Sequence, residues 1–268
     1  MKELNASEEQ LHRSFDSLLE RDQAYQELEK LLVHTGKQRL DELRSTYRRP
    51  VLCRLETQLI EALTRHGFVQ VATPILLAKG LLAKMSITED HPLSSQIFWV
   101  GENKCLRPML APNLYFLLKD LLRLWEKPVR IFEIGPCFRK ESQGALHLNE
   151  FTMLDLVEMG LSEDKREQNI KEFAALVMET AGISDYHSIT TSSEVYGSTI
   201  DIVVEGLDVE VGSGAMGPHS LDHEWGIVDP WVGIGFGIER LLMVRGNCNT
   251  LKSVGRSLTY LNGVRLNI

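Results

Sequence analysis

The sequence predicts an α+β fold in which an antiparallel sheet is flanked by helices and preceded by a helical N-terminal extension. Over residues 50–66 and 111–125, apolar side chains recur every three to four positions, which is typical of amphipathic helices. From residue 129 the apolar period changes to two in a series of short segments, with one helical segment, 163–181, among them. Strands joined by short turns pair antiparallel, so we do not expect a doubly wound parallel sheet.

Residues 1–48 are expected to form the N-terminal extension. An amphipathic helix is predicted over 7–32, where Ser7 and Gln10 have the spacing of a capping box. Its apolar positions are Leu11, Phe15, Leu18, Tyr25, Leu28 and Leu32. A second, short and basic helix is predicted over 37–48. Pro50 then marks the start of the next helix and of the main domain, 49–268, because proline is tolerated in the first helical turn.

The main domain is predicted to begin with a helix that ends at Gly67, followed by the strand VQVATP (69–74). The helix 111–125 comes next, with an apolar stripe that includes Leu114 and Leu118. The later strand candidates are VRIFEIG, PCFRKE, EFTMLDLVEM, STIDIVV, LDVEVG and WVGIGFG. The last of these leads into another helical segment, GIERLLMVRG (237–246).

Composition limits the class of protein. A chain of 268 residues, 43% hydrophobic and 25% charged, is long enough for one sizeable domain with its own core. It contains no apolar run near the ~18 residues of a membrane span, and its polar N-terminus has no apolar signal region. The four cysteines are far apart, without metal-ligand spacing. We therefore expect a cytoplasmic protein without a membrane partner.

The charge is unevenly distributed along the chain. The formal net charge is −8, which by itself argues against a nucleic-acid partner. Residues 240–268, however, contain five basic residues and no acidic one. Residues 31–50 contain only two acidic residues against five basic ones, which are Lys37, Arg39, Arg44, Arg48 and Arg49. Local positive surfaces on an acidic body indicate binding of a polyanion, although solvated basic faces are the alternative.

The segment WVGIGFGIER (231–240) is a candidate ligand site. On a strand, Gly233, Gly235 and Gly237 would share one face, and a face without side chains lets a flat ligand lie against the backbone. Arg240 follows in the first turn of the next helix, where its planar guanidinium suits a phosphate. Taken alone, a glycine-rich bend followed by a surface arginine is the more common explanation of such a short motif.

A second candidate is the strand–loop–strand segment CFRKESQGALHLNEFTMLDLVEM (137–159). Arg139 and Glu141 are expected on one face of its first strand, with His147 in the loop. On the second strand Phe151 and Asp155 share a face. Such a hairpin could hold an α-phosphate, accept a hydrogen bond from an exocyclic amine and stack on a purine. The alternative is an edge hairpin with a solvated, charged tip.

The order of these segments resembles a known family. GFVQVATP (67–74), FRKE (138–141) followed by HLNEF (147–151), and GIGFGIER (233–240) stand in the order of the three signature motifs of class II aminoacyl-tRNA synthetases. Four further stretches resemble the catalytic domain of pyrrolysyl-tRNA synthetases, particularly the bacterial form whose N-terminal tRNA-binding domain is a separate chain. They are LRPMLAPNLY (106–115), FEIGPCFRKES (132–142), VYGSTID (195–201) and DPWVGIGFGIERLL (229–242). The resemblance covers nearly the whole chain and implies the class II catalytic fold.

The resemblance implies that ATP binds to the two motifs described above. Arg139 and Arg240 would hold the α- and γ-phosphates, and His147 would reach the outer phosphates. Glu141 and Phe151 would bind adenine.

The resemblance also implies a magnesium site. Glu210 and Ser213, in LDVEVGSG, correspond to the family's metal-binding pair, and a carboxylate beside a hydroxyl suits a hard ion that stays partly hydrated. Arg139, Glu210 and Arg240 are therefore the expected catalytic residues.

The implied amino-acid pocket is mostly apolar and suits a long side chain that ends in a methylated ring. It would be lined by Ala111, Leu114, Tyr115, Leu118, Asp155, Val157, Tyr196, Ala215, Trp231 and Gly233. Most of these would pass as ordinary core residues. Two depart from the family's pattern: the family usually has Asn at Asp155, which donates to the substrate's side-chain carbonyl, and often a Cys or another small residue at Val157. An ionised carboxylate only accepts hydrogen bonds, so a natural or engineered pocket variant is one interpretation.

The expected activity is ATP-dependent activation of pyrrolysine, or a related lysine derivative, and its transfer to the cognate amber-decoding tRNA. The five basic residues of 37–49 would contact this tRNA. A homodimer built on residues 50–74 and a separate N-terminal tRNA-binding protein are the further partners that the resemblance implies. The alternatives are a ligase of the same fold, or a pocket variant, that activates another amino acid, and a non-catalytic tRNA-binding relative.

Overall fold

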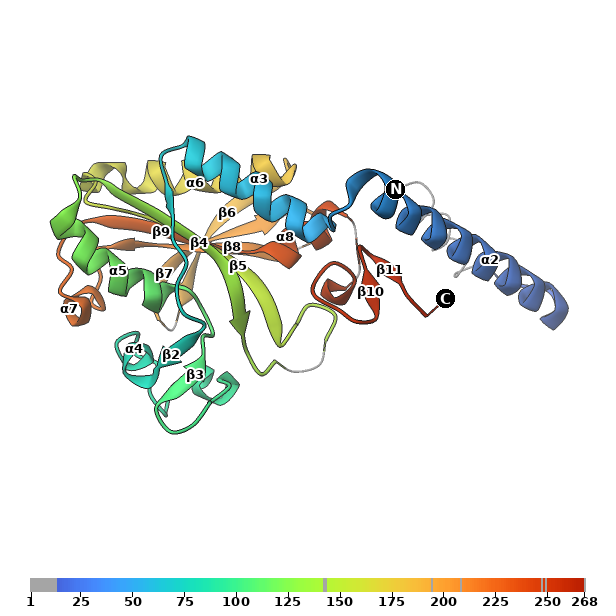
Figure 1. The fold of residues 1–268 in the computed structure, drawn as a ribbon, viewed down its shortest axis with the longest axis horizontal. Helices are drawn as coiled ribbons and strands as arrows, with labels where there is room; N and C mark the ends of the chain where they lie inside the picture. The colour runs from blue at the N-terminus through green and yellow to red at the C-terminus, as the bar shows by residue number, and fades with distance from the viewer. Residues whose placement is uncertain are drawn as a thin grey trace.

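A seven-stranded sheet forms the centre of the computed structural model, which describes residues 14–141, 144–193, 195–207, 209–246, 248 and 250–267 (Figure 1). Across the sheet the strands are β1 (Val69–Gln70), β4 (Val129–Phe138), β5 (Glu150–Met159), β9 (Trp231–Gly237), β8 (Val209–Gly217), β7 (Gly197–Val204) and β6 (Tyr186–Ser193). All neighbouring strands pair antiparallel except β1 and β4, which are parallel. The α+β class with an antiparallel-rich sheet is thus confirmed.

One face of the sheet is covered by three helices (Figure 1). They are α3 (Val51–Arg65), α6 (Arg166–Ala181) and α8 (Ile238–Arg245). Leu55, Leu59 and Leu63 of α3 are fully buried, as the apolar period predicts. They belong to the larger hydrophobic core, with inward residues of the central strands such as Leu154 and Ile234. The predicted surface helix 163–181 is therefore also a core helix on its inner side.

The opposite face carries smaller elements and leaves room for a cavity. They are α5 (Ala111–Leu124), α4 (Lys79–Ala83), α7 (Asp222–Trp225) and a two-stranded sheet of β2 (Leu76–Ala78) and β3 (Lys104–Leu106). Short 3₁₀ segments occupy Pro92–Gln96, Glu163–Lys165 and Leu251–Ser253. A hairpin of β10 (Tyr260–Leu261) and β11 (Val264–Arg265) lies near the C-terminus. The sequence did not predict α4, α7, β2, β3, β6, β10 or β11.

The N-terminal extension differs from the prediction. A single helix, α2 (Leu18–Glu42), continues into a π-helical turn over Leu43–Tyr47 and projects away from the sheet (Figure 1). The predicted separation into two helices is wrong, because Gly36 costs only ~1 kcal/mol inside a helix and does not break it. Ser17 caps α2 by accepting from Glu20 N at 3.2 Å, whereas the predicted cap at Ser7 and Gln10, like Leu11, lies outside the described residues. Among the described positions of the predicted apolar stripe, only Leu28 is buried.

Two strand predictions need correction. The strand predicted over 69–74 forms ladder pairs only at Val69 and Gln70. The two segments predicted on either side of Pro136 form one strand, β4, which ends at Phe138. Because β1 pairs with β4 only at Ile131 and Phe132, β4 has a free edge at Pro136, where a missing N–H is tolerated.

The early end of β4 changes the position of two candidate residues. Arg139 and Glu141 lie in the loop after β4, so the prediction that both stand on the strand is wrong. Lys140 N, between them, donates to Gln96 O at 2.7 Å, which draws the chain toward another loop.

No helix within the described part of the chain combines the length and the apolar character that crossing a membrane requires.

Candidate active site

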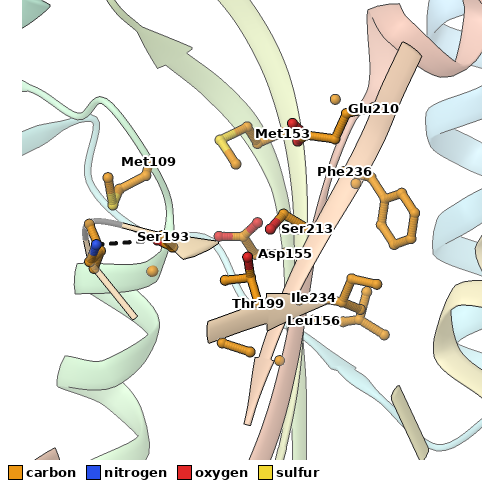
Figure 2. Close-up of a pocket in the computed structure, with 18 of the residues that line it drawn as sticks. Met109, Met153, Asp155, Leu156, Ser193, Thr199, Glu210, Ser213, Ile234 and Phe236 are labelled. Atoms are coloured by element: carbon orange, nitrogen blue, oxygen red, sulfur yellow. Dashed lines mark hydrogen bonds between the residues drawn. The ribbon is translucent and has the colours of Figure 1, made fainter. Parts of the chain in front are cut away.

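A cavity of about 390 Å³ lies between α5 and the sheet face opposite α3 and α6. This volume is in the range of sites for small ligands. Its wall contains all seventeen residues that the sequence assigned to ATP, metal and amino-acid binding, from Ala111 in α5 to Arg240 in α8. The structure therefore brings both predicted subsites into one continuous space, part of which Figure 2 shows.

Strand parity places the residues of β5 and β9. Phe151, Met153, Asp155 and Val157 line the cavity, whereas the alternate residues Leu154 and Leu156 belong to the core, although Leu156 also contributes to the cavity lining. On β9, Gly233, Gly235 and Gly237 line the cavity, whereas Ile234 and Phe236 belong to the core and also contribute to the lining between the glycines. The predicted glycine face of β9 is thus confirmed.

A β-bulge in β8 brings Glu210 and Ser213 to the same wall. Side chains three positions apart on a regular strand point to opposite faces. In the pairing of β7 with β8, Val203 stands opposite Glu210 and Ile202 opposite Gly212, so Val211 is the extra residue. Because a bulge adds one residue to one strand, it reverses the alternation, and both Glu210 and Ser213 line the cavity.

The cationic end of the cavity contains Arg139 and Arg240. Arg240 Nη1 donates to Glu210 O at 2.9 Å and lies 3.6 Å from its Oε1. Burial raises the pKa of the Glu210 carboxyl, and the positive charge of Arg240 opposes this shift. Arg139 Nε donates to Pro108 O at 2.9 Å, and burial lowers the pKa of its guanidinium. Both cations thus donate hydrogen bonds to backbone carbonyls of the chain itself.

Phe151, the residue predicted to stack on a purine, is partly covered by Arg139. The guanidinium carbon of Arg139 lies 5.3 Å from the centre of the Phe151 ring, so the cation stacks on one face of this ring. His147 Nε2 lies 3.9 Å from Glu141 Oε2, and both residues line the cavity. A purine bound here would therefore share Phe151 with Arg139 or use its other face.

A hydrogen-bond chain that the sequence did not predict orients Ser213. Its hydroxyl donates to Asp201 Oδ1 at 2.6 Å, and Thr191 Oγ1 donates to Asp201 Oδ2 at 2.6 Å. Thr191 and Thr199 hydroxyls are 2.9 Å apart. Because the Ser213 proton is directed to Asp201, the lone pairs of its oxygen remain for a ligand. In the sequence, this hydrogen-bond chain is indicated only by Asp201, which is the one acidic residue in the apolar segment STIDIVV (198–204).

The far end of the cavity is aromatic. The Tyr115 ring stacks on Trp225 with centroids 5.4 Å apart and meets Trp231 edge-on at 5.6 Å. Tyr196 meets Trp231 at 6.1 Å. Asp222, a buried residue that the sequence analysis missed, accepts from Trp231 Nε1 at 2.8 Å and holds this ring in place. The wall is therefore rigid and mostly apolar, as predicted for the amino-acid subsite.

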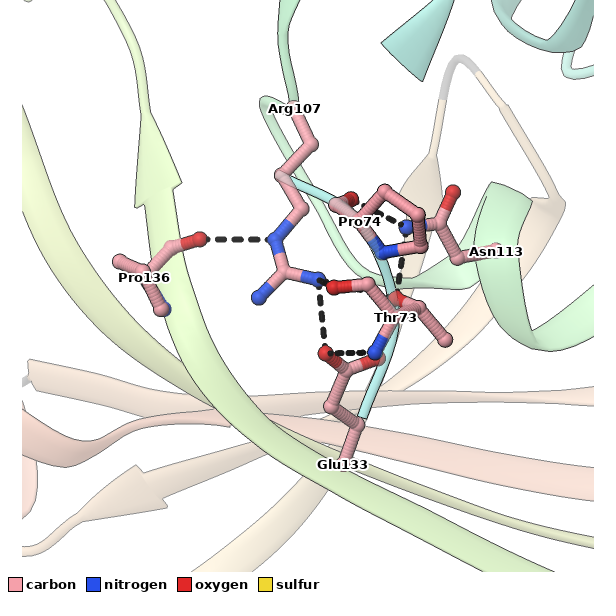
Figure 3. Close-up of polar contacts among 6 residues, drawn as sticks. All are labelled: Thr73, Pro74, Arg107, Asn113, Glu133 and Pro136. Atoms are coloured by element: carbon pink, nitrogen blue, oxygen red, sulfur yellow. Dashed lines mark hydrogen bonds and ion pairs between the residues drawn. The ribbon is translucent and has the colours of Figure 1, made fainter. Parts of the chain in front are cut away.

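A buried ion pair connects the segment around Pro74 with the sheet beneath the cavity (Figure 3). Arg107 Nη1 donates to Glu133 Oε1 at 2.7 Å, and both side chains are at most 3% exposed. Thr73 donates to the same carboxylate from its N–H at 3.1 Å and its hydroxyl at 2.6 Å. Asn113, near the start of α5, donates to Thr73 Oγ1 at 2.7 Å and to Pro74 O at 3.0 Å. These contacts fix α5 relative to β4.

The predicted tRNA-contacting residues lie apart from the cavity. Lys37, Arg39, Arg44, Arg48 and Arg49 are exposed on α2, on the π-helical turn and in the following residues. Three of them contact other residues of the chain. Arg39 Nη2 donates to Asn262 O, near the C-terminus, at 3.3 Å. Arg44 pairs with Asp41, and Arg49 Nη2 donates to Cys53 O at 2.8 Å.

The residues of β8 fit a hard divalent ion that keeps other ligands. Glu210 supplies a carboxylate on the cavity wall, and Ser213 supplies a hydroxyl oxygen whose proton is engaged elsewhere. Within the described ranges, no three His, Cys, Asp or Glu side chains converge on one point. A site with one carboxylate and one hydroxyl suits Mg²⁺, which usually retains waters and binds phosphate oxygens.

Comparisons with known proteins agree with this geometry. The profile of the tRNA synthetases class II (D, K and N) matches residues 53–191. The lysine–tRNA ligase of Thiobacillus denitrificans is 28% identical over 194 residues, which is 72% of this chain and 34% of that protein. The threonine–tRNA ligase of a Wolbachia species is 28% identical over 143 residues, 51% of this chain and 22% of that protein. The chain thus spans about a fifth to a third of these relatives.

Two solved structures are similar over almost their whole length. The pyrrolysyl-tRNA synthetase of Desulfitobacterium hafniense is 56% identical with a TM-score of 0.93, and the match covers 100% of this chain and 95% of that one. A structure of PylSc, a pyrrolysyl-tRNA synthetase of the same organism, is 55% identical with a TM-score of 0.89 and coverage of 97% and 90%. The chain therefore belongs to the class II aminoacyl-tRNA synthetases and, within that class, to the pyrrolysyl-tRNA synthetase family.

Proposed function

We propose that this chain activates pyrrolysine, or a related lysine derivative, with ATP and transfers it to the cognate amber-decoding tRNA. The observation that carries the proposal is the single cavity that joins a cationic end, with Arg139 and Arg240, to a rigid aromatic end at Tyr115 and Trp231. An amino acid and ATP bound end to end in it would meet at their reacting groups. The similarity to pyrrolysyl-tRNA synthetases supports the same assignment.

In the first step, the substrate carboxylate oxygen attacks the α-phosphorus of ATP, the bond to the β-phosphate oxygen breaks, and pyrophosphate leaves with its electron pair. Arg139 and Arg240 would stabilise the charge that develops on the phosphate oxygens. Phe151 and Glu141 would hold the adenine. The chemistry needs no protein nucleophile, so positioning and electrostatics supply the catalysis.

Class II synthetases use ATP and Mg²⁺, and Glu210 and Ser213 are the residues that would hold the ion here. When bound, the ion would neutralise phosphate charge. Asp201 would act as a positioning residue, because it accepts a hydrogen bond from the Ser213 hydroxyl and leaves the lone pairs of that oxygen for an ion.

In the second step, a hydroxyl of the tRNA 3′-terminal ribose attacks the adenylate carbonyl and AMP leaves. The exposed basic residues of α2 and its C-terminal turn would bind the tRNA backbone. We further propose a homodimer in which α3 and the segment ending at Pro74 contact the second subunit, a separate N-terminal tRNA-binding protein as a partner, and a cytoplasmic location.

Pyrophosphate exchange tests the activation step. The purified chain is assayed with ATP, Mg²⁺ and a panel of pyrrolysine, lysine and Nε-substituted lysines, followed by AMP release with and without pyrrolysine tRNA. We expect exchange with at least one Nε-substituted lysine and AMP release that depends on tRNA. Absence of exchange across the panel would contradict the proposed function, and AMP release without tRNA would instead favour a ligase of the same fold.

A further inference from the structure

A cluster of charged side chains surrounds Arg256, in the C-terminal segment that follows α8. Arg256 Nη1 donates to Thr152 Oγ1 at 2.5 Å and lies 3.8 Å from Glu239 Oε1. Its Nε lies 3.7 Å from Glu150 Oε1, and its Nη2 lies 3.8 Å from Glu56 Oε1. One cation thus faces three carboxylates, which come from α3, β5 and α8. No step of the proposed reaction uses this cluster.

Thr152 and Glu239 lie where the ladder between β5 and β9 ends. The last ladder pair is Met153 with Gly237, because the chain turns from β9 into α8 at this point. The Thr152 N–H would therefore have no ladder partner, and the Glu239 side chain supplies one. Both carboxylate oxygens accept from this N–H, at 3.0 and 2.8 Å, and Oε1 also accepts from the Thr152 hydroxyl at 2.9 Å. The carboxylate thus joins β5 to α8 where the sheet ladder stops.

The chain neighbours of these two residues are residues assigned to ATP. Phe151 precedes Thr152 on β5, and Arg240 follows Glu239 on α8. Phe151 lines the cavity, whereas Thr152 is fully buried and, by strand alternation, points to the other face of the sheet. The contact between Thr152 and Glu239 therefore sets the position of the expected purine contact relative to the expected phosphate contact.

Burial makes this contact depend on a nearby cation. Thr152 and Glu239 are both buried. Burial raises the pKa of the Glu239 carboxyl, and the hydrogen bonds from Thr152 and the charge of Arg256 oppose this shift. A buried carboxylate stays ionised only with such compensation. Arg256 also donates to the Thr152 oxygen, so the hydroxyl proton is directed to Glu239.

The segment 250–256 also packs on the loop between β4 and β5. Leu251 N donates to Ala145 O at 2.9 Å. A β-carbon at Gly255 would lie 3.0 Å from Leu148 Cδ1, so the backbone of the segment passes close to this part of the loop. The loop contains two more of the residues expected to bind ATP. The segment thus contacts the ATP-binding hairpin at its loop as well as at its second strand.

We infer that Arg256 is a positioning residue for ATP. Without touching the nucleotide, it holds Thr152 and Glu239 together and keeps the purine contact in place relative to the phosphate contact. Among the described residues, neither Arg256 nor Thr152 lines the cavity. The inference rests on the proposed function, because it concerns the ATP end of the same cavity. It predicts a selective effect: loss of Arg256 should weaken ATP binding and leave the aromatic end, with Tyr115 and Trp231, unchanged.

The test compares the unaltered chain with Arg256→Gln, Arg256→Lys and Thr152→Val. Thr152→Val keeps the branched shape and removes the hydroxyl that links Arg256 to Glu239. Arg130→Gln is the matched control, because the Arg130 side chain is 36% exposed and pairs with Glu158, which is 2% exposed, at the other end of β5. The side chains of Arg256 and Glu239 have nearly the same exposures, 39% and 2%.

Three measurements are made on each form. Calorimetry gives the Kd for ATP with Mg²⁺ in the absence of an amino acid. Pyrophosphate exchange gives the KM for ATP and the KM for the amino acid, and denaturant unfolding gives the stability.

We expect Arg256→Gln and Thr152→Val to raise the Kd and the KM for ATP by about tenfold or more, with the KM for the amino acid unchanged. Arg256→Lys should recover part of the loss, because it restores the positive charge. Arg130→Gln should lower the stability without changing the values for ATP. In the double variant Arg256→Gln/Thr152→Val the two effects should not add, since both act through one link.

A Kd for ATP that stays at the unaltered value in both Arg256→Gln and Thr152→Val would overturn the inference and leave the proposed function intact. So would an equal rise in Arg130→Gln, because it would reflect lost stability alone. If Arg256→Gln does not fold, the Kd values of Thr152→Val and Arg256→Lys decide in the same way. Loss of exchange in every form, with ATP binding still dependent on Arg256, would contradict the proposed function and not the inference. Absence of ATP binding by the unaltered chain would overturn both.

Discussion

At the scale of single residues, the two cavity arginines differ in their exposure and in the groups that they contact. Arg139 is partly buried and donates to a backbone carbonyl, whereas Arg240 is about one-third exposed and lies beside Glu210. Neither cation is neutralised by a closely paired buried carboxylate, unlike Arg107. Positive charge is therefore available for an anionic ligand at this end of the cavity.

Replacing either cavity arginine should abolish activation while the fold remains intact. We expect Arg139→Ala and Arg240→Ala to lower the pyrophosphate exchange rate by on the order of 10²-fold or more, by analogy with the removal of a preorganised donor. Arg123→Ala is the control, since Arg123 is exposed and outside the cavity. Near-normal exchange by both cavity variants would disprove the phosphate assignment.

The buried Asp155 carboxyl should make the unfolding free energy of the protein depend on pH. Its pKa is raised to about 7 by burial, so the folded state is penalised once the pH rises above the carboxyl's unfolded value of ~3.9. Asp155→Asn should therefore stabilise the chain, and the gain in unfolding free energy should grow by on the order of 2–3 kcal/mol between pH 5 and pH 8. Denaturant unfolding at both pH values measures it, and a gain that does not depend on pH would mean that Asp155 titrates normally.

At the scale of secondary-structure elements, the strands determine which residues lie together on the cavity wall. The N-terminal extension determines where positive charge is exposed. On β5 and β9 the predicted site residues occupy alternate positions, and on β8 Glu210 and Ser213 share a wall only because of the bulge. α2 makes few contacts with the rest of the described chain, which are mainly with β11. Its basic residues are thus exposed to solvent, and Arg39 also contacts the turn between β10 and β11.

The exposed basic residues of the extension should contribute to tRNA binding but not to amino-acid activation. The variant that tests this contribution combines Lys37→Gln, Arg44→Gln and Arg48→Asn. Arg48 has φ 53°, which Asn tolerates, and Arg49 is left unchanged because it donates to Cys53 O in α3. Each lost phosphate contact should flatten the log–log salt dependence of tRNA affinity by about one unit.

The matched control for that variant neutralises three other exposed basic residues, Arg123, Lys165 and Lys171. Affinity and salt dependence are measured for both triple variants, together with pyrophosphate exchange. Equal tRNA affinity in the two variants would identify the basic residues of the extension as a solvated face.

At the scale of the whole molecule, the cavity exists because α5 is held at a fixed position over the sheet. The buried pair of Arg107 and Glu133, with Thr73 and Asn113, links α5, β4 and the segment before β2 (Figure 3). Gly135 on β4 leaves the space that the Arg107 guanidinium occupies, since a β-carbon there would collide with it. Three segments distant in sequence therefore depend on one ion pair.

Removing the carboxylate of this pair should destabilise the whole domain. Glu133→Gln leaves the Arg107 cation buried without its counter-charge, so we expect a loss of about 3–5 kcal/mol in unfolding free energy. Glu89→Gln is the matched control, because the Lys79–Glu89 pair is exposed and screened by solvent, so its loss should hardly change stability. Chemical denaturation measures both, and a similar small loss in the two variants would show that water reaches the Arg107 site.

The sequence by itself determined the elements whose local pattern is strong and the identity of the cavity wall. The apolar periods of α3 and α5, the alternation of β5 and β9, and the motifs around Arg139 and Arg240 are all local properties, and all seventeen predicted cavity residues line one space. Most residues of the amino-acid pocket were named only through the resemblance to pyrrolysyl-tRNA synthetases, because by their own pattern they would pass as ordinary core residues.

Only the tertiary structure decided how these residues are arranged. The bulge at Val211 depends on the pairing of β7 with β8 and cannot be seen in β8 alone. The end of β4 at Phe138 depends on the loop that takes over the hydrogen bonds of the chain. Asp155, Asp201 and Asp222 are all plain aspartates in the sequence, but one is left unpaired, one orients Ser213 and one holds Trp231. Partners and burial come from segments far apart in the chain, and these determine what a carboxylate does.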